Sequence, residues 1–287
     1  MPQSNTLRAA LWMIGAIVSF TAMSIAGRQV SFALDTFEIM LFRSVIGVVL
    51  VVVIGGIAGT LYQINRDKLG LHGLRNLAHF IGQNLWFFAL PIIPLAQLFA
   101  FEFTSPIWVI LLSPLLIGER ITRIGAFAAI VGFIGVLLVA QPGSATLSWG
   151  LGAAAACAIF FAITAIFTRK LTQTASITCI MFYLTGMQLI FGLICAGFDG
   201  DIALPDATTL PWLIVIGLAG LTAHFCMTTA LSLAPASVVM PIDFVRLPTI
   251  AVIGFLFYDE SVNLLLVVGA AFILAANYAN IVYGQRR

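Results

Sequence analysis

The stretch ALPIIPLAQLFAFEFTSP at residues 89–106 returns in altered form as ALSLAPASVVMPIDFVRL at residues 230–247, which is 141 residues further along the chain. The rare letters that this offset aligns are Pro94 with Pro235, Glu102 with Asp243, Arg28 with Arg169, and Glu119 with Glu260. Apolar letters match by chance in so hydrophobic a chain, but aligned acids, prolines and arginines are poorly explained by chance. The matches indicate an internal repeat, with one copy in residues 1–143 and the other in residues 144–287.

The composition places the chain in a lipid bilayer. Of its 287 residues, 61% are hydrophobic and only 8% are charged, and the mean hydropathy is +1.11. A soluble domain carries about 25% charged residues, because water must solvate its surface. The net charge of +2 leaves no basic surface for a nucleic acid. The four cysteines lie in apolar runs without CxxC spacing, so we expect small hydrophobic side chains and no disulfide framework.

Ten apolar stretches have the length that a transmembrane helix needs, which is about 20 residues. They cover residues 7–27, 34–61, 70–90, 95–117, 123–140, 147–168, 177–198, 210–233, 237–258 and 263–283. The runs are continuous and do not alternate with polar residues, so helices are predicted and not membrane strands. The predicted fold class is an all-α membrane protein with ten transmembrane helices. We expect the first span to stay in the protein and not to be cleaved as a signal peptide.

The repeat and the number of spans together predict an inverted topology. Each half holds five spans, and five is odd, so the second half enters the membrane from the opposite face. Inverted repeats are typical of secondary transporters, which bind substrate near the midplane between the halves. Two similar halves of opposite orientation give two nearly equivalent conformations, and each exposes one central site to a different side.

The basic residues predict the orientation. With a cytoplasmic N-terminus and ten crossings, one side holds ten lysines and arginines while the other holds only Arg28. The ten are Arg8, Arg66, Lys68, Arg75, Arg120, Arg123, Arg169, Lys170, Arg286 and Arg287. The predicted location is a bacterial inner membrane, with both termini in the cytoplasm.

Several short motifs resemble those of the drug/metabolite transporter superfamily, and most closely its EamA-type members. They are Ala89-Leu90 with Pro94-Leu95-Ala96, then Thr104-Ser105-Pro106, Gly118-Glu119-Arg120, and Gly132 to Pro142. The resemblance covers nearly the whole chain and implies ten helices in two five-helix halves. It also implies a bacterial inner-membrane carrier of small metabolites, either an exporter or an importer. The second half departs from the pattern by placing Asp243 and Arg246 inside a span, so the resemblance does not define the substrate.

Four ionisable residues, Arg43, Glu102, Asp243 and Arg246, fall inside the predicted spans. A charge at the centre of a membrane helix costs about 2.5–3.5 kcal/mol on insertion scales, so it usually faces a cavity or a partner. Counting about 1.5 Å per residue places all four in one central zone. They either pair with each other and hold helices together, or they bind substrate or a coupling proton. The recurrence of the acids in both halves favours the second interpretation.

A polar and aromatic stripe marks the third span. His79, Gln83 and Trp86 follow each other at the spacing of one helix face, and the repeat aligns Gln83 with His224 of the other half. The stripe is either the lining of a solute cavity or a set of hydrogen bonds between helices. Two histidines without nearby cysteines do not predict a metal site. The predicted substrate-binding set is therefore Arg43, His79, Gln83, Trp86, Glu102, His224, Asp243 and Arg246.

Prolines punctuate the fourth and ninth spans at Pro94, Pro106, Pro235, Pro241 and Pro248. A proline within a helix removes a backbone hydrogen bond, so kinks are predicted beside the central zone.

The sequence thus predicts a secondary active transporter for a small polar metabolite, working by alternating access. Mixed charge favours a zwitterion, such as an amino acid or a compound like S-adenosylmethionine. The alternatives are a carrier of organic anions held by Arg43 and Arg246, and a channel or accessory subunit. We find no nucleophile–base pair and no phosphate-binding motif, so neither enzymatic activity nor a cofactor is predicted. The expected partners are a small-molecule substrate, with coupling to protons or to exchange, and the bilayer, around a monomer or homodimer.

Overall fold

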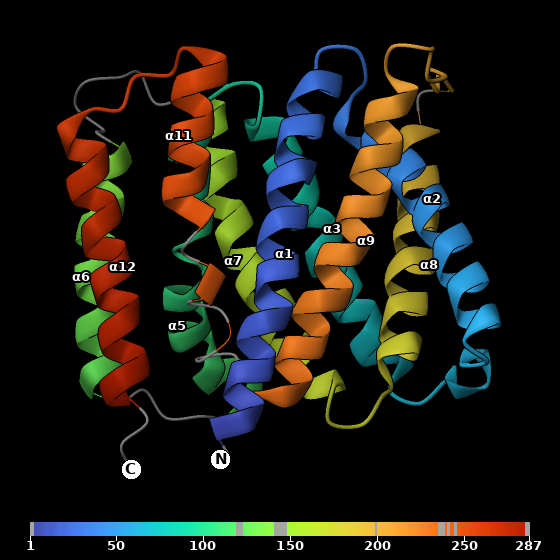
Figure 1. Cartoon of the computed structure of the whole chain (residues 1–287), viewed down its shortest axis with the longest axis horizontal. Helices are drawn as coiled ribbons and strands as arrows, with labels where there is room; N and C mark the ends of the chain where they lie inside the picture. The colour runs from blue at the N-terminus through green and yellow to red at the C-terminus, as the bar shows by residue number, and fades with distance from the viewer. Residues whose placement is uncertain are drawn as a thin grey trace.

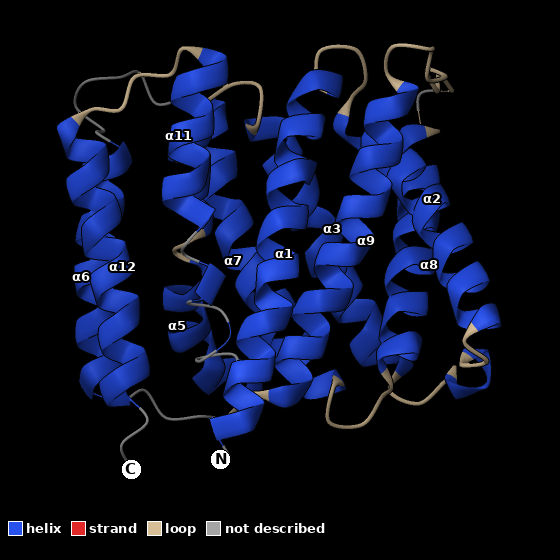
Figure 2. Ribbon diagram, in the orientation of Figure 1, coloured by secondary structure: helices blue, strands red, loops and turns tan. Residues whose placement is uncertain are grey.

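The computed structural model describes residues 3–118, 123–140, 148–198, 200–234, 239, 242–243 and 246–284, and the regular structure in these parts is helical (Figure 2). The helices are α1 (Gln3–Val30), α2 (Thr36–Ile57), the 3-10 helix η1 (Leu61–Gln63), α3 (Leu69–Ala89), α4 (Leu95–Glu102), α5 (Ser105–Ile117), α6 (Arg123–Ala140), α7 (Trp149–Leu171), α8 (Ile177–Ala196), α9 (Leu210–Leu233), α11 (Arg246–Tyr258) and α12 (Leu264–Gly284).

The helices have the length and the surface of a multi-pass membrane protein. Six helical segments in the described residues are long and apolar enough to cross a bilayer, and three shorter apolar segments accompany them. Large apolar side chains lie exposed on their outer faces, among them Ile57, Phe133 and Phe255. So many exposed apolar side chains suit lipid and not water. The expected all-helical membrane protein is confirmed.

The helices pack as neighbours from distant parts of the chain. Helix α1 lies against α9, α3 against α7, α2 against α8, and α6 against α12. Figure 1 shows α6 and α12 at one edge of the bundle, α2 and α8 at the other, and α1, α3, α7 and α9 between them. At the α6–α12 contact, a Cβ on Gly135 would come within 2.7 Å of the Gly269 carbonyl oxygen, so these backbones touch closely.

The fourth predicted span is broken in the middle. Helix α4 ends at Glu102 and α5 begins at Ser105, with a turn at Phe103 and Thr104 between them. Pro106 has no N–H, so it cannot donate the helical hydrogen bond to the Glu102 carbonyl. Instead, Thr104 N–H bonds to the Phe101 carbonyl at 2.9 Å, which tightens the chain. The break places Glu102 at a helix end inside the bundle.

Of the five prolines that we expected to kink helices, the three in the described residues lie at helix starts, which corrects the sequence prediction; Pro114, which was not among the five, lies inside α5. Pro94 is the N-cap of α4, Pro106 is the second residue of α5, and Pro248 lies in the first turn of α11. Proline is tolerated there because the first N–H groups of a helix have no partner within the helix.

Some predicted features lie outside the described residues. They are Glu119, Arg120, Pro142, Pro235, Pro241, Arg286, Arg287 and the expected junction between the two halves at residues 143 and 144.

Candidate functional site

A cavity lies at the centre of the bundle, among α1, α3, α4, α5, α7, α9 and α11. Seven of the eight predicted residues line it, namely His79, Gln83, Trp86, Glu102, His224, Asp243 and Arg246. Its volume is about 60 Å³. One water molecule needs on the order of 10–15 Å³ on the same kind of measure, so the cavity has room for a handful of waters. A metabolite would therefore require some of these side chains to move.

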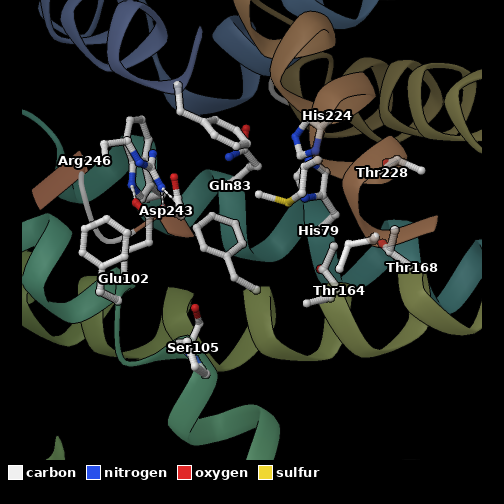
Figure 3. Close-up of a pocket in the computed structure, with 18 of the residues that line it drawn as sticks. His79, Gln83, Glu102, Ser105, Thr164, Thr168, His224, Thr228, Asp243 and Arg246 are labelled. Carbon is white, nitrogen blue, oxygen red and sulfur yellow. Dashed lines mark hydrogen bonds and ion pairs between the residues drawn. The ribbon is translucent and has the colours of Figure 1, made fainter. Parts of the chain in front are cut away.

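The charged end of the cavity is built around Arg246, in the first turn of α11. Its Nη2 donates to Glu102 Oε1 at 2.6 Å and to Asp243 Oδ2 at 2.5 Å. The Trp86 indole N–H donates to the other oxygen of Glu102 at 2.7 Å. Figure 3 shows Arg246, Asp243 and Glu102 gathered on one side of the cavity. The two acids, which the repeat places at equivalent positions, thus share one cation.

Aromatic rings enclose this cluster. The Arg246 guanidinium carbon lies 4.8 Å from the ring centre of Phe20 and 4.9 Å from that of Phe99. Ring faces attract a cation and exclude water, so they strengthen the ion pairs. Asp243 Oδ1 and Arg246 Nε nevertheless have no hydrogen-bond partner among the described residues. Buried polar atoms are rarely left unpaired, so this cluster has bonding capacity in reserve.

Two histidines form the middle of the cavity. The rings of His79 on α3 and His224 on α9 lie 4.6 Å apart and perpendicular to each other (Figure 3). Phe161 lies beside His79, and Phe20 lies edge-on to His224 at 5.5 Å. Within the described part of the chain, neither nitrogen of His79 has a hydrogen-bond partner. The pair presents polar atoms in a mainly aromatic wall.

Arg43 is the one predicted residue that does not line the central cavity. Its Nη1 donates to Gln83 Oε1, and it lines a smaller adjoining pocket together with His224. Gly220 of α9 makes room for it, because a Cβ at position 220 would lie 2.6 Å from Arg43 Nε. Arg43 therefore supports the cavity wall through Gln83. The expected single zone of four charges is thus two clusters, one around Arg246 and one at Arg43.

Arg75 is the main site residue that the sequence analysis misassigned. We counted it among the cytoplasmic flanking cations, but the structure buries it in α3 with 1% of its surface exposed, lining the cavity. Its Nε donates to Thr168 Oγ1 of α7 at 3.0 Å. A signal was present in the sequence, because Arg75 lies four residues before His79 and extends the same polar face of the helix.

Hydroxyl groups form the end of the cavity opposite the charged cluster. Thr164, Thr168 and Thr228 line it, and Figure 3 shows Thr168 and Thr228 on the far side of the histidine pair from Arg246. The sequence analysis passed over these threonines because their spacing in apolar helices is not distinctive. Among the described residues no group of three histidines, cysteines, aspartates or glutamates is close enough together to hold a metal ion.

The two ends of the bundle are fastened differently. At the end where α11 and α12 are joined, Glu260 pairs with Arg28 and accepts a hydrogen bond from Leu95 N–H at 2.8 Å. We call these three residues the Arg28–Glu260 latch. At the opposite end, Arg169 Nη1 donates to the backbone carbonyl of Leu231 at 2.6 Å. The repeat aligns Arg28 with Arg169. These equivalent arginines therefore differ in their partners, which are a carboxylate for Arg28 and a backbone carbonyl for Arg169.

The fold and the cavity define a class, a polytopic helical membrane protein with a charged cavity enclosed at its centre. The chain belongs to the EamA-like transporter family, whose profile matches residues 7–141 and again residues 148–281. The predicted superfamily is confirmed, and membership indicates transport and not enzymatic catalysis.

Named relatives transport different metabolites. A riboflavin transporter of Vibrio cholerae is 28% identical over 88% of this chain and 86% of its own. A pseudopaline exporter of Pseudomonas aeruginosa is 28% identical over 96% and 94%, and an S-adenosylmethionine uptake transporter of Rickettsia bellii is 23% identical over 96% and 94%. A crystal structure with 17% identity superposes with a TM-score of 0.70 over 99% of this chain and 97% of that one, so the fold is shared.

Proposed function

We propose that the chain is a secondary active transporter that moves a small polar metabolite by alternating access through the central cavity. The observation that carries the proposal is the buried cluster of Glu102, Asp243 and Arg246 in the cavity wall. Membrane helices keep costly charges at sites that bind ions or solutes, or where the charges pair with each other. Here Glu102, Asp243 and Arg246 pair with each other and also line the cavity, where a solute would reach them.

An inverted repeat of two five-helix halves is the second part of the proposal. Twelve cavity-lining residues form six pairs at the 141-residue offset. They are Phe20 with Phe161, Met23 with Thr164, Gln83 with His224, Trp86 with Met227, Glu102 with Asp243, and Ser105 with Arg246. A cavity lined by equivalent positions of both halves is what a two-fold axis through the site would produce.

The helix packing supports the same symmetry. Exchanging the halves turns the α1–α9 contact into the α7–α3 contact, and both contacts are present. The pairs α2–α8 and α6–α12 each map onto themselves. The two family matches begin at residues 7 and 148, which are also 141 residues apart. We infer ten membrane-spanning segments with five in each half.

We further propose that the structure represents the state that faces the cytoplasm. If the protein lies in a bacterial inner membrane with both termini in the cytoplasm, the Arg28–Glu260 latch lies at the periplasmic end of the bundle and closes that end. The cavity reaches towards the other end, where Leu231 lies near the end of α9. The exchange of partners at Arg28 and Arg169 would then accompany the change of state.

The proposed substrate is a zwitterion of amino-acid or S-adenosylmethionine type. An acid-rich cluster at one end of the cavity suits a cationic group, and Arg75 at the wall suits an anionic one. The named relatives carry metabolites that differ widely, so the family leaves the substrate open. An organic-anion carrier is the second candidate, because Arg43 and Arg75 have only uncharged partners among the described residues.

Uptake and counterflow in proteoliposomes test the proposal. The purified full-length protein would be offered amino acids, S-adenosylmethionine, flavins and simple carboxylates, with and without a pH gradient. A carrier saturates, and unlabelled substrate inside the vesicles accelerates entry of the labelled compound. Conductance without such exchange would indicate a channel and overturn the proposal. Rates equal to those of empty vesicles for every compound would also contradict it.

A further inference from the structure

We propose that Arg75 and the threonines beside it form a subsite that binds the carboxylate of the transported molecule. This inference rests on the proposed transport function and names one chemical feature that the substrate must carry. Arg75 is nearly completely buried in α3, and its side chain reaches the cavity wall. The site contains a positive charge, free hydroxyl hydrogens and a rigid support, and each follows from separate contacts.

The first argument is the charge of Arg75 and its partners. Its Nε donates to Thr168 Oγ1 at 3.0 Å, and its Nη1 donates to Asn76 Oδ1 at 2.8 Å. Both acceptors are neutral, and Nη2 bonds to no group among the described residues. A buried charge usually requires an ionic partner, because burial removes the water that stabilises it. Nη2 is therefore the donor that remains for a ligand.

The second argument is a contrast within the cavity. Arg246 lies between two carboxylates, so its charge is more than neutralised. Arg43 lines the adjoining pocket, and its own partners are the Gln83 amide and the Met40 sulfur. Arg75 in the cavity wall and Arg43 in the adjoining pocket thus carry two like charges, which repel each other, without an acidic partner in the described residues. An anion entering there would relieve the repulsion.

The hydroxyl groups supply further donors. Thr168 accepts from Arg75, and its own hydrogen is bonded to no acceptor in the described part of the chain. Thr228 is buried in the same wall, and no intramolecular bond of its hydroxyl is found within the described residues. A planar guanidinium with hydroxyl groups beside it matches the two oxygens of a carboxylate.

The support of Arg75 is rigid. Asn76, which accepts from Arg75, donates its own amide to the Tyr183 carbonyl at 3.1 Å. Gln188 of α8 donates to the Asn76 carbonyl at 2.8 Å. These bonds tie the start of α3 to α8 and hold the guanidinium in place without neutralising it. Such preorganisation reduces the entropy that binding must offset.

The test compares each transported carboxylate with its carboxamide and its methyl ester, which are similar in size but uncharged. Wild-type protein in proteoliposomes is expected to prefer the carboxylate at least tenfold in initial counterflow rate at low concentration. In Arg75→Gln the preference should fall to about onefold, because the carboxylate loses the partner that distinguishes it from the carboxamide. Arg75→Lys should keep part of the preference, because the charge remains while the planar fork is lost.

Two further variants keep the test decisive. Thr168→Val preserves the shape of the side chain and should reduce the preference several-fold even if Arg75→Gln fails to fold. Arg8→Gln makes the same charge change at an exposed residue of α1 and should leave the preference intact. If the wild type takes carboxylate and carboxamide equally well, or if Arg75→Gln and Thr168→Val keep the preference, the subsite is wrong while transport stands. A wild type without counterflow of any compound overturns the transport function and the subsite with it.

Discussion

The two halves of the chain supply matching residues to the walls of the cavity, but they differ where the cavity carries charge. Phe20 and Phe161 occupy equivalent positions and both line it. Arg246, in contrast, stands where the first half has Ser105. The acids Glu102 and Asp243 recur in both halves, yet they converge on this one arginine because only the second half supplies it.

The same kind of difference explains the position of Arg43. Gly220 stands in the second half where the first half has His79. The missing side chain leaves the space that the Arg43 guanidinium fills, and Arg43 then holds Gln83 in the cavity wall. Positions where the two halves carry similar residues thus form the cavity walls. Positions where the halves carry different residues place the charges and make the cavity asymmetric. Making the halves more alike at the unlike positions is the way to test this division.

The largest effect is expected from Arg246→Ala. It removes the cation between Glu102 and Asp243, so two acids would face each other in a buried site. We expect uptake to fall by about 100-fold or more, which corresponds to about 2.7 kcal/mol in the transport barrier. Initial uptake rates in proteoliposomes measure this, and the variant should still insert and elute as a monodisperse protein.

Ser105→Ala is the matched control at the equivalent position of the first half. Ser105 lines the same cavity but carries no charge, so its loss should reduce uptake less than threefold. Normal transport by Arg246→Ala would remove the charged cluster from the transport mechanism. Equal losses in the two variants would mean that position and not charge matters.

Gly220→Ala is expected to have the second largest effect. The new methyl group would lie 2.6 Å from Arg43 Nε, so the guanidinium must move and its bond to Gln83 is lost. Overpacking of this kind costs about 1–3 kcal/mol. We expect a lower thermal midpoint and an uptake rate reduced about five- to tenfold. A thermal melt of the purified protein and uptake measurements test both.

Gly186→Ala is the control for this substitution. Gly186 lies in α8, and a Cβ there meets nothing within 4 Å. It should leave uptake and the thermal midpoint nearly unchanged, since alanine favours a helix more than glycine does. If Gly220→Ala behaves in the same way, Arg43 does not depend on the space at Gly220.

Glu102→Gln separates the two equivalent acids, with a smaller effect on rate. Glu102 is the more exposed of the pair, with 13% of its side-chain surface accessible against 5% for Asp243. If a carboxyl in the cavity carries a coupling proton, the accessible one is better placed to exchange it. We therefore expect Glu102→Gln to flatten the dependence of uptake on pH more than Asp243→Asn does. An unchanged profile for Glu102→Gln would exclude it as the proton carrier.

The sequence was sufficient for the class of fold because hydropathy acts locally. Apolar runs bounded by charges or turn residues fix where a helix leaves the membrane, and α2, α8 and α9 lie within the predicted stretches. For the break at Phe103 and Thr104, the sequence offered only Pro106, which indicated a kink nearby and not the end of a helix. A proline predicts a disturbed helix, but the surrounding packing decides between a kink and a new helix.

The site was harder to predict because the depth of a residue in the membrane does not tell which neighbouring helix its side chain faces. Counting residues placed Arg43 and Arg246 at similar depth, yet one bonds to Gln83 and the other to two acids. Arg75 lies near the end of the second turn of α3, where about 9 Å of rise separates it from the helix start. That depth suits either the membrane surface or the interior, and the contact with Thr168 of α7 decides for the interior.

The smallest effect is expected from Asp206→Asn, outside the membrane. Bonds from Thr208 and Thr209 lower the pKa of Asp206 from 3.8 to about 2, the side-chain bond from Thr208 contributing most. Because the pKa is lower in the folded state, the stabilisation is complete above about pH 4 and is lost as the pH falls towards 2. The variant keeps an acceptor oxygen. The thermal midpoints of the wild type and of Asp206→Asn at pH 7 should differ by about 1 °C or less. Between pH 4 and 3 the midpoint of the variant should depend less on pH than that of the wild type.

The equivalent residue of the first half provides the reciprocal experiment. Asn65 Oδ1 accepts from Asp67 N–H at 3.0 Å, just as Asp206 Oδ1 accepts from Thr208 N–H at 2.9 Å. Asn65→Asp should therefore keep the turn and acquire a dependence of the thermal midpoint on pH below 4, if its folded-state pKa is lowered in the same way. A large loss of stability in either variant at pH 7 would show that the two loops are not interchangeable, and that the halves differ structurally beyond the positions that charge the cavity.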